Sequence, residues 1–67
     1  MKKSIQLEGV TTQEEIREAA RLLVEHPIVT DAAMTVRIDF NTLIIETERI
    51  STFLACRIML RHWGFIS

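Results

Sequence analysis

The spacing of the apolar residues changes within residues 9–15, and this change constrains the fold more than any other feature. Before it, Ile5 and Leu7 alternate with polar residues, as in a strand with one buried face. After it, apolar residues recur at every third or fourth position, as on the buried face of a helix. We therefore predict a strand over residues 4–10 and a helix over residues 12–25. The apolar stripe of this helix comprises Ile16, Ala19, Ala20 and Leu23.

The predicted helix has signals at both ends and on its outer face. Thr12 and Glu15 have the spacing of a capping box, in which each side chain binds the backbone N–H of the other residue. Glu18 and Arg21 are spaced to form an ion pair on the outer face. His26 precedes a proline, and such a residue avoids helical geometry. We expect His26 to be a solvent-exposed helix end, at the opposite edge of the molecule from His62.

The rest of the chain predicts a hairpin, a second helix and a short last strand. Apolar residues alternate over residues 32–38, a polar turn follows at 39–42, and residues 43–47 form the second strand. Ser51 is a suitable N-cap for a helix to about residue 62, and Gly64 stands where a helix-ending glycine is expected. Residues 65–67 then form a short strand. The core stripe of the second helix comprises Phe53, Cys56, Met59, Leu60 and Trp63.

The order strand, helix, strand, strand, helix and short strand predicts one α+β domain spanning residues 1–67. An antiparallel sheet with two helices on one face is a ferredoxin-like sandwich. The chain has 67 residues, of which 48% are apolar, and this composition favours a packed globular domain. The fold class therefore follows from the order of the elements.

Composition excludes several classes of function. A net charge of −1 gives no general attraction for nucleic acid or for an anionic membrane. The longest apolar run, residues 53–56, is far shorter than the roughly 20 residues of a membrane span, so no direct membrane insertion is expected. Cys56 alone cannot form an intramolecular disulfide, which favours the cytoplasm. The chain shows no phosphate-binding loop and no nucleophile paired with a base, so we predict a non-enzymatic protein without a cofactor.

The element order and length resemble the heavy-metal-associated domain family, which comprises small copper chaperones and the amino-terminal modules of metal-transporting P-type ATPases. The resemblance covers nearly the whole chain. The family's Gly-Met-x-Cys-x-x-Cys motif, which opens its first helix, corresponds to the segment Gly9-Val10-Thr11-Thr12-Gln13-Glu14-Glu15, and two further matches are Ile28-Val29 and Gly64-Phe65.

This chain differs from the family at its chemistry. Thr12 and Glu15 stand where the two metal-binding cysteines would be, and a hydroxyl with a carboxylate cannot reproduce a thiolate site for copper or zinc. The resemblance therefore implies a heavy-metal-associated-like module that has lost its metal site. It would serve as a docking or regulatory domain linked to metal transport, and its partner would be another protein or the rest of a transporter.

Two groups of residues are candidate sites. In this fold the start of the first helix and the end of the second lie at the same edge, so the first group is a binding loop with residues close to it in space: Gly9, Val10, Thr11, Thr12, Glu14, Glu15, His62 and Phe65. The second is an interaction surface in which a basic ridge lies beside two aliphatic residues outside the core stripe: Leu54, Arg57, Ile58 and Arg61.

Three alternatives remain open from the sequence. The first is a weak metal site formed by Glu14, Glu15 and His62. The second is a small-molecule sensor of the amino-acid-binding regulatory type, whose domains share this element order; Gly9 and the threonine-rich loop are its ligand-loop features. The third is a homodimer through the sheet edge left by the short last strand, because an unpaired edge readily recruits another chain.

Overall fold

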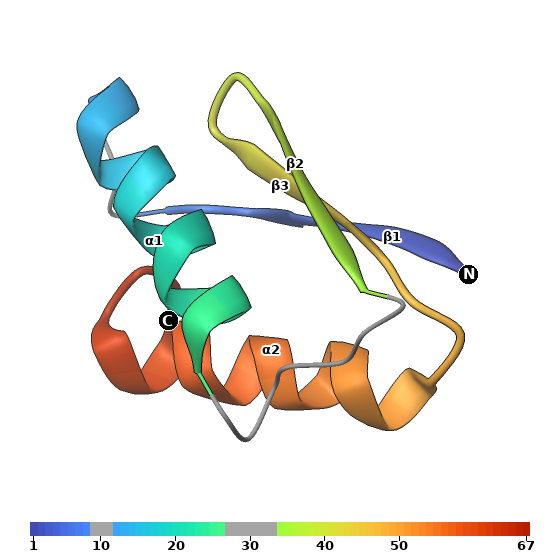
Figure 1. Cartoon of the computed structure of the whole chain (residues 1–67). Helices are drawn as coiled ribbons and strands as arrows, with labels where there is room; N and C mark the ends of the chain where they lie inside the picture. The colour runs from blue at the N-terminus through green and yellow to red at the C-terminus, as the bar shows by residue number, and fades with distance from the viewer. Residues whose placement is uncertain (9–11, 27–33) are drawn as a thin grey trace.

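A computed structural model describes residues 1–8, 12–26 and 34–67 of the chain. In these residues a three-stranded antiparallel sheet has the strand order β1-β3-β2, and two helices pack on one of its faces (Figure 1). The fold is the predicted α+β sandwich of the ferredoxin-like type. Its elements in chain order are β1 (Lys2–Gln6), α1 (Gln13–Glu25), β2 (Thr35–Asp39), β3 (Thr42–Glu46) and α2 (Ile50–Trp63).

Both helices contribute to a single core with one face of the sheet. Ile5 stands opposite Leu43 in the β1–β3 pair, and the side chain of Leu43 is fully buried. The buried sheet residues all point to the face that carries the two helices, and no helix of the described residues covers the opposite face (Figure 1). The buried apolar residues are Ile5, Leu7, Ile16, Ala19, Leu23, Leu43, Ile45, Phe53, Cys56 and Leu60.

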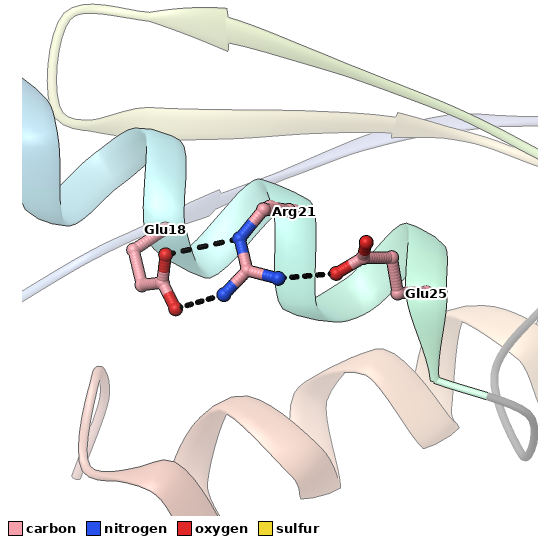
Figure 2. Close-up of polar contacts among 3 residues, drawn as sticks. All are labelled: Glu18, Arg21 and Glu25. Carbon is pink, nitrogen blue, oxygen red and sulfur yellow. Dashed lines mark hydrogen bonds and ion pairs between the residues drawn. The ribbon is translucent and has the colours of Figure 1, made fainter.

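The outer face of α1 carries the predicted ion pair. Arg21 bonds both carboxylate oxygens of Glu18, and its guanidinium also binds Glu25 one turn further along (Figure 2). These contacts, with Glu18 as the main partner, raise the pKa of Arg21. All three side chains are about half exposed, so this cluster contributes little to stability.

The edges of the predicted strands need two corrections. β1 begins at Lys2, two residues earlier than predicted, because Lys2 and Lys3 pair with β3 although neither is apolar. Ile38 is 39% exposed instead of buried, since it lies at the tip of an edge strand. Phe40, in the turn that follows, has a positive φ of 59°. The predicted strand residues 9–10 and 32–33 lie outside the described residues.

The two ends of α2 differ from each other in how well they were predicted. Gly64 adopts the left-handed conformation with φ 92°, which confirms it as the helix-ending glycine. The predicted N-cap was wrong, because the helix begins at Ile50 and places Ser51 inside its first turn. Arg49 is the N-cap and makes no side-chain capping bond; its N–H donates to the buried hydroxyl of Thr47 at 3.2 Å. This turn sets the start of the helix.

The predicted last strand is absent from the described residues. The Phe65 N–H donates to the Leu60 carbonyl at 2.9 Å and so completes the end of α2. The Phe65 carbonyl accepts from the N–H of Glu8, two residues beyond the end of β1, at 3.2 Å. Because the first residue after Gly64 is committed to ending the helix, a single backbone bond replaces the expected strand pairing.

Candidate functional site

The start of α1 is a capped turn built by two side chains. Thr12 has extended backbone angles, and its Oγ1 accepts the Glu15 N–H at 3.2 Å, which confirms this half of the capping box. The same hydroxyl donates to the Glu15 carboxylate at 3.0 Å. Glu14 is exposed beside them. The other predicted loop residues, Gly9, Val10 and Thr11, lie outside the described residues.

These residues do not fit the metal that the family resemblance implies. The Thr12 and Glu15 side chains bind each other, and both offer oxygen where a soft metal ion requires thiolate sulfur. Within residues 1–8, 12–26 and 34–67, no group of three or more His, Cys, Asp or Glu side chains is placed to hold a metal ion. The structure therefore does not assemble Glu14, Glu15 and His62 into the alternative metal site.

The capping bond predicts the cost of removing the hydroxyl. Thr12→Ala is expected to lower the free energy of unfolding by about 1 kcal/mol, because the Glu15 N–H loses its acceptor. Thr12→Ser keeps an equivalent oxygen and should unfold within a few tenths of a kcal/mol of the parent. Urea unfolding followed by circular dichroism measures both variants. Equal losses in the two variants would contradict the capping role.

The ends of α1 and α2 meet through aromatic side chains, which the sequence did not indicate. The ring of His26 lies 5.6 Å from the Trp63 ring in an edge-on contact, and Phe65 lies 6.5 Å from Trp63 on the same cluster. The expectation that His26 is a solvent-exposed end far from His62 is therefore wrong, since His26 is half-buried against the residue after His62. His62 is itself exposed, and Phe65 is half-buried.

The predicted interaction surface is brought together by α2. Leu54 is 47% exposed and Ile58 is 62% exposed, as their position outside the core stripe predicts. With Arg57 and Arg61 they line a shallow hollow of about 310 Å³. Helical spacing explains this grouping, because residues three, four and seven positions apart share one face. We call these four residues the α2 hollow.

Cys56 belongs to the core. Its side chain is fully buried, its Sγ lies 3.7 Å from the Sδ of Met34, and burial raises the pKa of its thiol to about 11. A thiol that remains protonated at neutral pH is a poor nucleophile and a poor metal ligand. The position confirms the prediction that Cys56 lies on the core face of α2.

The raised pKa predicts an alkaline loss of stability. An unfolded thiol ionises near its ordinary pKa of 9.0, whereas the folded one resists ionisation up to about 11. The stabilising contribution is therefore complete below pH 9 and is lost as the pH rises from about 9 to 11. Urea unfolding across this range should show a steeper loss for the parent than for Cys56→Ala. Equal losses of stability with pH in the parent and in Cys56→Ala would contradict the raised pKa of the Cys56 thiol.

A second hollow was missed because it joins distant parts of the chain. It has a volume of about 360 Å³ and lies between β1, the middle of α2 and the last residues. Ser4, Phe53, Arg57 and Ile66 are among its lining residues. No local pattern could have indicated it, since the strand order β1-β3-β2 leaves this side of β1 open. We call it the β1 groove.

Comparison with protein-family models, with curated proteins and with solved structures finds no match to this chain. Neither helix in the described parts of the chain is long and apolar enough to cross a bilayer.

Proposed function

We propose that this chain is a non-enzymatic protein-interaction module of the heavy-metal-associated type, in which a capped helix start stands in place of the thiolate metal site. It would act in the cytoplasm as a docking or regulatory domain linked to metal transport. The α2 hollow is the observation that supports docking, because it places exposed Leu54 and Ile58 between two arginines on a helix that the core already holds.

Charge indicates the chemistry of the partner. Residues 49–67 include Arg49, Arg57 and Arg61 and contain no Asp or Glu. A complementary partner surface carries carboxylates around a small apolar centre, as an amphipathic acidic helix does. Leu54 and Ile58 would contact the apolar centre, and the arginines would set the orientation and speed of association.

The loss of the metal site is tested by metal titration. The protein is mixed with cuprous ion or zinc under reducing conditions, in competition with a chromophoric chelator. We expect no stoichiometric complex, because Thr12 and Glu15 offer oxygen atoms where the family's metal site has two cysteine thiolates. Tight one-to-one binding of either ion would overturn the lost-site proposal.

The docking surface is tested with a defined probe. A stapled peptide helix with leucines on one face and glutamates beside them is titrated into methyl-labelled protein. We expect the peptide to shift the methyl resonances of Leu54 and Ile58. These shifts should disappear when both Arg57 and Arg61 are changed to glutamate. Arg17→Glu, an exposed charge reversal on α1, is the matched control and should leave binding unchanged. Shifts confined to other surfaces would overturn the assignment.

A further inference from the structure

The side of β1 that faces away from β3 presents a regular row of backbone groups. Leu7 donates to Asn41 at 2.9 Å, and Met1 exchanges hydrogen bonds with Thr47 in both directions. Odd-numbered residues of β1 therefore bond to the β3 side, and even-numbered residues point outward, because the two alternate along an antiparallel strand. The Glu8 N–H, which binds the Phe65 carbonyl on the outer side, follows the same rule.

This row opens into the β1 groove. Ser4 and Gln6, whose backbone groups point outward, line it, and α2 forms its wall through Phe53 and Arg57. Lys2 continues the outward row beyond the lining residues. The last residues occupy only the far end, where Phe65 binds Glu8. Among the described residues, β3 is the only strand paired with β1. The groove thus has room and hydrogen-bonding groups for a further strand.

The charges around the groove favour an acidic occupant. Arg57 lines it, and the Lys3 ammonium lies nearby, 5.6 Å above the centre of the Phe53 ring. The carboxylate at this edge, Glu8, accepts a hydrogen bond from the Ser67 hydroxyl. Lys2 stands opposite Glu46 on the open face of the sheet, so its charge is partly balanced. The groove therefore has Arg57 in its wall with Lys3 beside Phe53, while its one lining carboxylate, Glu8, lies at the end that the last residues occupy.

We propose that the β1 groove binds an extended acidic segment of a partner protein as an added strand, with its backbone on Lys2, Ser4 and Gln6. Alternate side chains of this segment face α2, where carboxylates meet Lys3 and Arg57 and an apolar side chain meets Phe53. A second copy of this chain fits less well, because it would bring the same lysines and arginine to both sides of the junction. The site shares only Arg57 with the α2 hollow, on whose other residues it does not rely, and it does not depend on the proposed function.

The probe is the peptide Glu-Thr-Val-Thr-Glu-Thr-Val-Thr, acetylated and amidated. We expect saturable amide shifts and slowed hydrogen exchange at the outward N–H groups of Lys2, Ser4 and Gln6. Two control peptides separate the contributions: one has lysine for glutamate, and the other is N-methylated at alternate residues. Neither should bind, because the first reverses the charge and the second removes the strand donors. Equal binding of either control would overturn the proposal.

Two protein variants locate the binding site. Ser4→Pro removes an outward N–H without removing a bond to β3, and it should weaken binding of the peptide by about two- to tenfold, as the loss of one strand hydrogen bond predicts. Ile58→Ser, in the α2 hollow only, should leave this binding intact. If Ile58→Ser abolishes binding and Ser4→Pro does not, the peptide occupies the α2 hollow; the proposed function then stands and this inference falls.

Sedimentation of the protein alone tests the competing occupant. We expect the mass of one chain at all concentrations at which the peptide binds. A doubled mass that Ser4→Pro abolishes would overturn the peptide assignment and identify a second copy as the added strand.

Discussion

Replacing Leu60 with alanine is expected to lower the free energy of unfolding by about 3 kcal/mol. Leu60 belongs to α2 and has no exposed surface, because its side chain lies in the core that both helices share. Its truncation leaves a cavity that a small domain cannot easily close. A domain of this length has a total stability of roughly 3 to 10 kcal/mol, so the variant loses at least about a third of it.

Urea unfolding measures this loss, with the slope unchanged and the midpoint lowered. Ile58→Ala is the matched control, because Ile58 lies two positions earlier on the same helix and is 62% exposed. Its free energy of unfolding should change by no more than about 0.5 kcal/mol. Comparable losses in both variants would show that the apolar face of α2 is wrongly divided between core and surface. The control also shows that the α2 hollow can be altered without unfolding the protein.

Periodicity predicted the two helices because burial of one face determines the spacing of their apolar residues. Leu23 and Leu60 lie on the predicted stripes of α1 and α2, and both are fully buried. The start of β1 was not predictable in this way. Lys2 and Lys3 carry no apolar alternation, and their pairing with β3 is set by the register of the whole strand.

The prediction of a last strand over residues 65–67 was wrong for a related reason. Phe65 has the composition of a strand residue, yet its N–H is used to end α2. Sequence signals for a helix end and for a following strand overlap at this residue, and the helix end determines the conformation. The contact between His26 and Trp63 was also unpredictable, because it depends on how α1 crosses α2.

The two candidate surfaces also differ in whether a local sequence pattern could predict them. The α2 hollow was predictable because all four of its residues lie on one helix, where spacing alone places them together. The β1 groove brings together β1, α2 and the last residues, and it exists only because the sheet order leaves β1 at an edge. A local pattern contains no information about strand order. The groove could therefore be found only from the structure.

A proline at Ile5 is expected to unfold the domain, whereas a proline one residue earlier is expected to be tolerated. Ile5 stands opposite Leu43, so its N–H belongs to the β1–β3 ladder, and its side chain is 8% exposed. Ile5→Pro loses a core side chain and leaves the Leu43 carbonyl without its donor, for a combined cost of at least about 4 kcal/mol. This cost approaches the whole stability of a domain of this size.

Ser4→Pro removes only an outward N–H, and proline is accepted on that side of an edge strand, so the expected loss is about 1 kcal/mol or less. Circular dichroism and thermal unfolding of the two variants give the comparison, with Ser4→Ala as a control for the lost hydroxyl. Because a slip of one residue would exchange the inward and outward groups, the opposite result would mean that β1 has the other register. The open edge would then be formed by the N–H groups of Lys3 and Ile5, and the groove could not bind a strand as proposed.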